Sequence, residues 1–230
     1  MSSDTAEVAG IALNDGGPFV SRRDFVARSG LAGLAVVFVP LRSVVRERGW
    51  IASESTGSSL VHESLDGLAA YVVPGADAFS VAQGVTASGP GAVAARATDG
   101  FIDVVDALAP VTAPGNSATV AAVLNGLAGQ LDPRNSTPGF RSQFAGLSLE
   151  RKHAVFARLE RDPSEALRYL AAVAPALMAL LTYSEYGVFD RRTHRLSGRP
   201  VGWRISHYGG AADGHDELRG YYRPPAAPHA

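Results

Sequence analysis

The sequence predicts a mostly α-helical protein, with a small helical domain followed by an extended C-terminal arm rich in glycine and aromatic residues. Apolar residues recur at helical spacing in several stretches between residues 97 and 181, and no sustained alternation of polar and apolar residues indicates a strand. The 230 residues suffice for a buried core, and a hydrophobic content of 46% is typical of globular proteins. We therefore divide the chain into a leader with its flank (residues 1–50), a helical body (51–186) and the arm (187–230).

The leader carries a pair of arginines ahead of a short apolar stretch. Residues 21–25 read Ser-Arg-Arg-Asp-Phe, and a glycine-containing apolar stretch covers residues 31–39. This pattern is typical of twin-arginine export signals, with Arg22 and Arg23 as the pair and Phe25 as the apolar residue after it. The stretch is too short to span a bilayer stably. We expect the twin-arginine translocase to export the chain to the periplasm; the alternative is a buried helix that happens to follow two arginines.

The fate of the leader stays open at this point. No pattern of small residues that would favour cleavage follows the apolar stretch in residues 40–46. The leader is therefore cut at a poor site, kept as a membrane anchor, or packed against the rest of the protein.

The first three helices expected in the body begin at residues 97, 116 or 117, and 149. The first covers residues 97–110. The second runs to about Leu131 and is capped by Asn116 or Ser117, because short polar side chains satisfy the first free N–H groups of a helix. Ser148 caps the third, which ends near Arg161.

The last helix expected in the body has the clearest start. Asp162 supplies a capping carboxylate, Pro163 takes the first helical position, and Glu165 follows three residues after the cap. Apolar residues at helical spacing continue to Leu181, so this is the expected central helix of the core. Pro175 is expected to kink or split it.

Composition excludes several kinds of chemistry. With no cysteine, the chain has no disulfide, no thiolate metal site and no cysteine nucleophile. Its net charge of −1 gives no general attraction to nucleic acid, so we expect no nucleic-acid partner. The charge is uneven, since residues 51–137 are acidic whereas residues 138–230 carry a net positive charge.

No motif for a cofactor, a metal or a catalytic group stands in a convincing context. Residues 89–94 fit a dinucleotide-binding glycine pattern but follow no clear strand, and His62-Glu63 lacks the second histidine of a zinc protease. Asp213-Gly214 is more simply a turn than part of a metal site. We expect no catalytic, cofactor-binding or metal-binding residues in this chain. The weaker metal candidates lie together in the arm: His207, Asp213, His215, Asp216 and Glu217.

The arm is rich in glycine, yet it carries aromatic side chains that need a surface to bury against. Disordered linkers are usually poor in such residues. These rings pack either on the helical body or on another chain, where aromatic residues and arginine often anchor interfaces. The expected partner-contact residues are Tyr183, Tyr186, Trp203, Arg204, Tyr208, Asp213, Tyr221 and Tyr222.

Several segments together resemble a known family. These are the leader, the helix with Phe144, Leu149 and Phe156, the segment Leu-Leu-Thr-Tyr-Ser-Glu-Tyr-Gly at residues 180–187, and the tail with Gly202-Trp203, Tyr208-Gly209-Gly210 and Asp213-Gly214. They resemble subunit 3, the small subunit, of gluconate 2-dehydrogenase and related FAD-dependent sugar and alcohol dehydrogenases. The resemblance covers the leader and roughly residues 139–222.

The resemblance implies a non-catalytic accessory subunit. In that family a large GMC-type flavoprotein carries the FAD and oxidises the substrate, and a cytochrome c subunit often takes the electrons. The small subunit supplies the twin-arginine signal and assists folding, export and assembly of the flavoprotein, as a chaperone does. Two alternatives stay open from the residues: an exported structural or binding protein with no dehydrogenase partner, and a free-standing extracytoplasmic enzyme.

Overall fold

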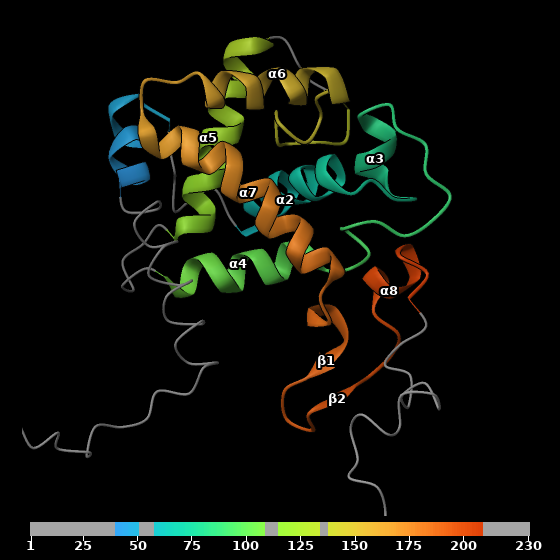
Figure 1. Ribbon diagram of the computed structural model, residues 1–230. Helices are drawn as coiled ribbons and strands as arrows, with labels where there is room; N and C mark the ends of the chain where they lie inside the picture. Colours follow the sequence, from blue (N-terminus) through green and yellow to red (C-terminus); the bar gives the residue numbers. More distant parts are fainter. Residues whose placement is uncertain (1–39, 51–57, 109–114, 134–137, 209–230) are drawn as a thin grey trace, which may run out of the picture.

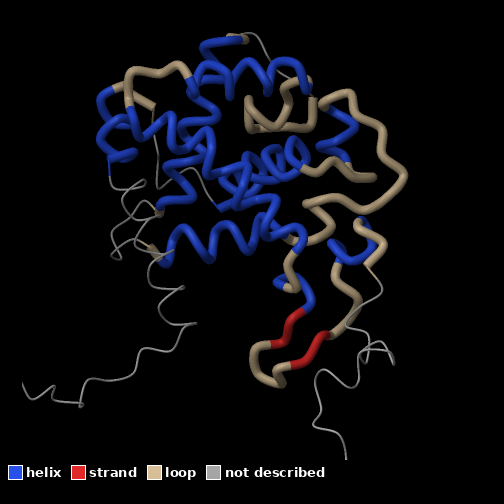
Figure 2. Tube along the Cα trace, viewed as in Figure 1, coloured by secondary structure: helices blue, strands red, loops and turns tan. Residues whose placement is uncertain are grey.

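The computed structural model describes residues 40–50, 58–108, 115–133 and 138–208. It is mostly helical, which confirms the predicted fold class, and an arm with a two-stranded sheet extends from one end of the helical body (Figures 1 and 2). Residues 40–47 are helical as well. The body contains α2 (Ser58–Val72), α3 (Ala78–Ala82), α4 (Ala97–Ala107), α5 (Asn116–Leu131), α6 (Leu149–Glu160) and α7 (Glu165–Tyr183). The arm contains η1 (Tyr186–Val188), β1 (Phe189–Asp190), β2 (Arg195–Leu196) and α8 (Val201–Ile205).

Helix α7 is the central helix of the body, as its apolar spacing predicts. It packs against α2, α4 and α6, and Leu167, Leu170 and Met178 are buried on it. Among the described helices, α7 alone is long and apolar enough to cross a membrane by length and composition. Its contacts with α2, α4 and α6, and the residues buried on it, are those of a helix in the core of the body. Pro175 lies inside α7, which continues past it to Tyr183, so the expected split does not occur.

The core extends into residues 40–50, which the sequence groups with the leader. Leu41 and Val45 are buried in the same cluster as the body helices, and so is Trp50. Gly126 of α5 makes room for the indole, because a Cβ there would lie 2.5 Å from the Cδ1 atom of Trp50. The last part of the expected flank is therefore structurally part of the body.

Helix α6 begins as predicted, whereas α5 and α7 begin differently. Ser148 caps α6 and accepts a hydrogen bond from the Arg151 N–H. The N-cap of α5 is Gly115, and the capping carboxylate comes from Asp106 of α4, which accepts hydrogen bonds from the N–H and hydroxyl of Ser117. The Asn116 side chain instead donates to the carbonyl of Val105, so neither predicted residue caps α5.

The start of α7 also differs from the prediction. Its N-cap is Ser164, not Asp162, and Pro163 lies before the first helical residue. The Asp162 carboxylate still accepts a hydrogen bond from the Ser164 N–H at 2.9 Å, but its other partner is distant in sequence. Arg48 donates to both of its oxygens, at 2.7 and 2.8 Å. The residue that looks like a local cap is therefore also half of an ion pair that ties residues 40–50 to the body.

Candidate partner-binding surface

The arm begins where α7 ends. The Ser184 hydroxyl donates to the carbonyl of Leu181 at 2.7 Å, which satisfies a free acceptor of the last helical turn. After η1 the chain forms an antiparallel hairpin in which Phe189 pairs with Leu196. Figure 1 shows this hairpin projecting beyond the helices.

The hairpin turn is organised by Asp190. Its carboxylate accepts hydrogen bonds from the N–H groups of Arg192 and Thr193, at 2.8 and 3.3 Å. Hydrogen bonds from the Thr193 side chain and from these two N–H groups lower the pKa of Asp190. His194 completes the turn with φ +53°, a conformation that few residues other than glycine adopt. The single carboxylate of the hairpin is thus committed to holding its own turn.

Two glycines fix the arm to the body by allowing close backbone contact. A Cβ on Gly202 of α8 would lie 2.5 Å from the Cα of Tyr183, and one on Gly187 would lie 2.5 Å from the carbonyl oxygen of Ala95. No side chain fits at either distance without movement of the backbone. The two ends of the arm are therefore packed on α7 and on the segment before α4.

Tyr186 adds a polar contact between the arm and α4. Its hydroxyl donates a hydrogen bond to the Asp103 carboxylate, and the Arg191 guanidinium lies 5.8 Å from the centre of its ring. Partial burial and the bond to Asp103 raise the pKa of Tyr186 to about 12. Tyr186 therefore remains a neutral donor at physiological pH and holds the base of the arm.

Large apolar side chains are exposed at the arm end of the molecule. We define the arm surface as Leu180, Tyr183, Phe189, Leu196 and Tyr208, whose exposed fractions are 67%, 47%, 39%, 38% and 48%. They come from the end of α7, the two strands and the segment after α8, which lie together in Figure 1. Large apolar residues gathered at one place on a monomer are a mark of an interaction site.

Trp203 supports this surface from α8. Its ring meets that of Tyr208 edge to face, with 5.2 Å between ring centres, and the Arg199 guanidinium donates to the Tyr208 carbonyl at 2.6 Å. Trp203 is half-buried whereas Tyr208 is exposed. We expected an extended chain in this segment, and the short helix α8 corrects that: within it the Trp203 ring lies against the ring of Tyr208.

The arm also carries exposed arginines. Residues 191–199 are all exposed, and so is Arg204. Between residues 187 and 208 one carboxylate, Asp190, faces five arginines: Arg191, Arg192, Arg195, Arg199 and Arg204. Aromatic residues with arginine are the composition that protein interfaces favour at their anchoring points.

The structure brings the described members of the predicted interface to one end of the molecule. Tyr183, Tyr186, Trp203, Arg204 and Tyr208 all lie on the arm or at its junction with α7, and Tyr186 is mainly an anchor to α4. The other predicted interface residues, Asp213, Tyr221 and Tyr222, lie outside the described residues, as do Arg22, Arg23 and Phe25 of the leader.

Lys152 is a buried residue that the sequence analysis missed. Its ammonium donates to the Gly67 carbonyl at 3.1 Å and to the Gln83 side-chain oxygen at 2.9 Å, and it lies 5.4 Å from the ring centre of Phe144. Burial lowers the pKa of Lys152 to about 7, and the negative charge of Asp77 opposes that shift. Its spacing from the buried residues of α6 could have revealed it, because Lys152 precedes Val155 by three residues and Phe156 by four.

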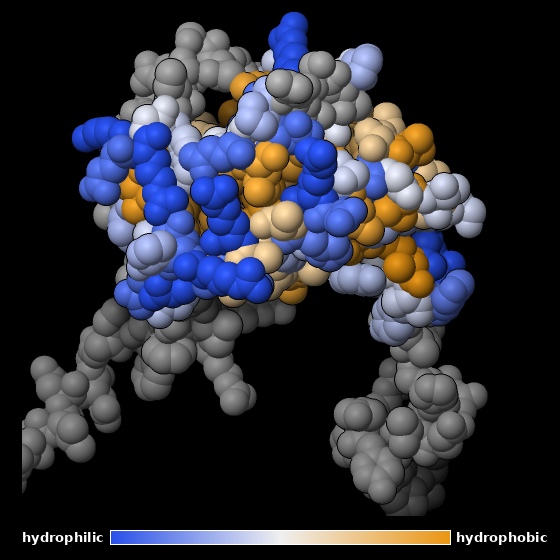
Figure 3. Space-filling model, turned by 90° about the horizontal axis from the view of Figure 1, so that it is seen from above, coloured by the Kyte–Doolittle hydropathy of each residue, from blue (hydrophilic) through white to orange (hydrophobic). Residues whose placement is uncertain are grey.

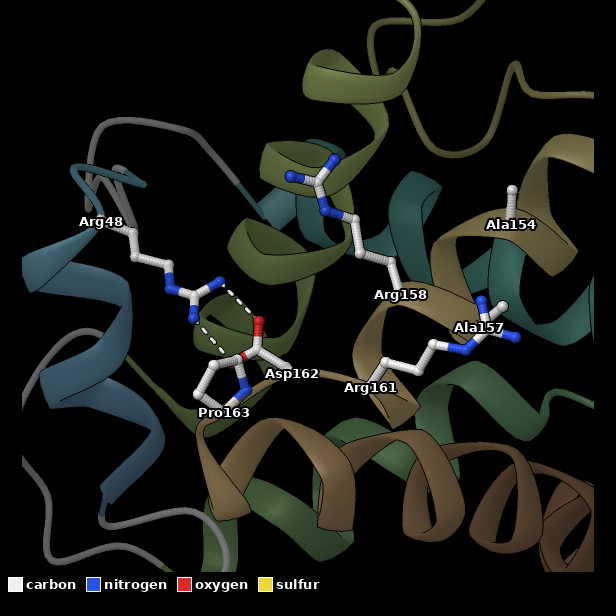
Figure 4. A pocket seen from close by; sticks show the side chains of 7 residues that line it. All are labelled: Arg48, Ala154, Ala157, Arg158, Arg161, Asp162 and Pro163. Atoms are coloured by element: carbon white, nitrogen blue, oxygen red, sulfur yellow. Dashed lines mark hydrogen bonds and ion pairs between the residues drawn. The ribbon is translucent and has the colours of Figure 1, made fainter.

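A groove at the turn between α6 and α7 was also missed. It has a volume of about 540 Å³ and is lined by Arg48, Ala154, Ala157, Arg158, Arg161, Asp162 and Pro163. Figure 4 shows Arg48 reaching the Asp162 carboxylate, while Arg158 and Arg161 extend from the end of α6. No short sequence motif predicts this groove, because Arg48 is separated from Arg158 and Arg161 by more than a hundred residues.

The described part of the chain contains no group of three or more His, Asp or Glu residues that could hold a metal. His62 lies 3.9 Å from Asp99, and the weaker metal candidates of the arm, apart from His207, lie outside the described residues. No family model, curated protein or solved structure matches this chain.

Proposed function

We propose that this chain is the non-catalytic small subunit of an extracytoplasmic FAD-dependent dehydrogenase complex, and that its arm surface binds the flavoprotein subunit. The observation that carries this proposal is the set of exposed apolar side chains on the arm and at the end of α7, in a segment that also carries exposed arginines. A projecting arm with this composition gains stability when a partner covers it.

The geometry of the arm suits binding better than catalysis. Its polar groups hold the arm itself: Tyr186 bonds to Asp103, Asp190 holds the hairpin turn, and Arg199 holds the Tyr208 carbonyl. What it offers outward is apolar area and guanidinium groups, which can pair with carboxylates on a protein surface. This supports a role as a partner-binding subunit.

The resemblance of the leader and of residues 139–222 supplies the proposed partners. They are a GMC-type flavoprotein that carries the FAD, a cytochrome c subunit as electron acceptor, and the twin-arginine translocase that reads Arg22 and Arg23. In this proposal the chain itself binds no FAD. It accompanies the folded flavoprotein during export and assembly.

Co-expression with a candidate flavoprotein tests this proposal. The candidate is a GMC-type oxidoreductase that lacks an export signal and is encoded beside this chain. We expect the two to co-purify with a flavin absorption spectrum. The double variant Tyr183→Ser/Tyr208→Ser should weaken the complex by about 2 kcal/mol or more, because truncating aromatic anchors of an interface typically costs that much.

Tyr169 provides the matched control. It lies on α7 away from the arm. Its exposed fraction of 50% is close to the 47% of Tyr183 and the 48% of Tyr208. Tyr169→Ser should leave the complex intact. An equal loss in both variants would contradict binding through the arm, and failure of any such flavoprotein to co-purify would favour an exported binding protein without a dehydrogenase partner.

Export provides a second readout. Replacing Arg22 and Arg23 by Lys should leave both chains in the cytoplasm, because lysine lacks the planar guanidinium of arginine. Normal export of the flavoprotein with this variant would contradict its carriage by this chain.

A further inference from the structure

The groove at the turn between α6 and α7 differs from the other described pocket in its charge balance. In the pocket between α4 and the hairpin, of about 400 Å³, Arg96 pairs with Asp99, Arg191 lies 3.9 Å from Asp103, and Asp190 holds its own turn. Each cation there has an anion of the same chain beside it. The α6–α7 groove lacks this balance.

Three arginines line the α6–α7 groove, but one carboxylate faces them. Asp162 is already engaged: its two oxygens accept from the Arg48 guanidinium, and one of them also accepts from the Ser164 N–H. Burial acts to raise the pKa of Asp162, but these hydrogen bonds and the charges of Arg48 and Arg158 outweigh it and lower the pKa. Asp162 therefore stays ionised and remains committed to Arg48.

Arg158 and Arg161 are left without a hydrogen-bond or ion-pair partner among the described residues, and both are exposed. A further arginine at this turn, Arg168, donates to the carbonyls of Asp162 and Pro163, so it adds positive charge without pairing with a carboxylate. The other acids of α6 and α7 are exposed and form no ion pair within the described ranges: Glu150, Glu160 and Glu165. Around the turn the four arginines Arg48, Arg158, Arg161 and Arg168 stand against three carboxylates, Glu160, Asp162 and Glu165. The positive excess is concentrated in the lining of the groove, where three arginines stand against Asp162.

The space between these groups is open because the residues of α6 that line it are small. Ala154 and Ala157 leave the groove unfilled. In Figure 4 the Arg158 side chain extends away from α6 and the Arg161 side chain turns toward Ala157, so an anion between them requires both exposed side chains to turn inward. Figure 3, which views this end of the body from above, shows strongly hydrophilic residues on one side of the face and hydrophobic patches in the middle and on the other side. A helix C-terminus favours basic residues in its last turn, but that preference does not require a groove beside them.

We propose that the α6–α7 groove binds an oxyanion that carries two or more negative charges. Arg158 and Arg161 donate charge-assisted hydrogen bonds to it, and the Arg48–Asp162 pair forms the opposite wall. Guanidinium groups match both phosphate and carboxylate oxygens, so a phosphate compound and a polycarboxylate share the required chemistry. The site lies apart from the arm, and this inference does not depend on the proposed function.

Calorimetric titration of the full chain with pyrophosphate, and separately with citrate, tests this inference at constant ionic strength. We expect saturable one-to-one binding of at least one of them, with a Kd of about 1 mM or lower. Preference for pyrophosphate would indicate a phosphate ligand, and preference for citrate a carboxylate ligand. Absence of saturable binding by both anions would overturn the proposal.

Three double variants separate binding in the groove from general attraction to surface charge. Arg158→Gln/Arg161→Gln should weaken binding about tenfold or more, whereas Arg192→Gln/Arg195→Gln, an equal charge change on the hairpin, should leave the Kd within about twofold. Ala154→Leu/Ala157→Leu fills the groove while keeping every arginine, and it should also abolish binding. Equal weakening by the groove and hairpin arginine pairs, or undiminished binding in the filled groove, would overturn the proposal. Unchanged thermal melts without anion would show that each variant is folded.

Discussion

The helical body and the arm use the same kinds of residues in opposite ways. In the body, large side chains such as Phe101 and Phe144 are fully buried. Polar groups there have partners within the body: the Asn125 side chain donates to the Ser64 hydroxyl and accepts from the Ser142 hydroxyl. In the arm, residues 191–199 are all exposed, and the apolar residues of both strands are exposed with them.

This difference indicates where each region obtains its stability. The body buries its apolar surface against itself, which is the main favourable term in folding. The arm is held at its two ends, through Tyr186 with α4 and Gly202 with α7, while the surface between them faces outward. A change in the body should therefore alter folding, whereas a change in the arm should alter binding.

Matched phenylalanine substitutions provide the strongest test of this comparison. Phe101 is fully buried and Phe189 is 39% exposed. Phe101→Ala should lower the free energy of unfolding by about 3–5 kcal/mol, because it removes buried area and leaves a cavity. Phe189→Ala should cost less than about 1 kcal/mol. Chemical denaturation of both variants measures the difference, and similar costs would show that the hairpin is part of the core.

The buried Lys152 predicts how the stability of the body depends on pH. Its pKa falls from 10.5 in the unfolded chain to about 7 in the folded one, so between these values the unfolded state binds the extra proton. Stability should therefore rise with pH from about 7 and gain about 3 kcal/mol by pH 9.5, at 1.36 kcal/mol for each pKa unit. Below about pH 7 Lys152 is protonated in both the folded and the unfolded state, so its contribution to the free energy of unfolding no longer changes with pH.

Tyrosines should reverse the trend at higher pH. The pKa values of Tyr71 and Tyr186 are raised, so above about pH 10 the unfolded chain loses protons that the folded one keeps, and stability falls. Lys152→Met should remove the rise between pH 7 and 9.5 and preserve the fall above pH 10. Denaturation midpoints measured across this range test both parts, and a rise that persists in the variant would refute the role of Lys152.

The smallest expected effect lies where the two regions meet. Tyr186→Phe removes the hydroxyl that donates to Asp103, and it should cost about 0.5–1.5 kcal/mol or less, as a partly exposed hydrogen bond typically contributes. The hairpin should loosen before the body does. We expect faster hydrogen exchange at the Ser197 N–H, which donates to the Val188 carbonyl, with no change in α7.

Tyr183→Phe is the control for that experiment, because Tyr183 lies at the same junction with its side chain exposed. It should leave exchange in the hairpin unchanged. If exchange in α7 and in the hairpin rose together, the arm and the body would unfold as one unit, and the comparison between them would fail.

Local signals in the sequence predicted the body well. The helical spacing of apolar residues located α4, α5, α6 and α7, and Ser148 caps α6 because its partner, Arg151, is three residues away. The mostly helical fold follows from these stretches. Helix α2 was not predicted, since its many small residues weaken the apolar pattern.

The candidate surface was only partly predictable. Its aromatic residues and arginines can be read from the sequence, but whether a ring packs on the body or faces outward depends on the fold. Trp203 is half-buried with its ring against that of Tyr208, and Tyr208 is exposed, although both are aromatic residues of one short segment. The outward surface is set by where the end of α7, the hairpin and α8 meet.

The sequence by itself therefore determined the kind of protein this is: helical segments, an arm with aromatic residues and arginine, and no cysteine chemistry. Helix spacing and local caps depend on neighbours within about four residues, which the sequence displays directly. The tertiary structure alone decided the contacts between distant residues. Asp106 caps α5 through Ser117, Arg48 meets Asp162 across 114 positions, and Lys152 is enclosed by groups from other elements. Such pairings arise only when packed helices bring separate parts of the chain together, because no local rule links their positions.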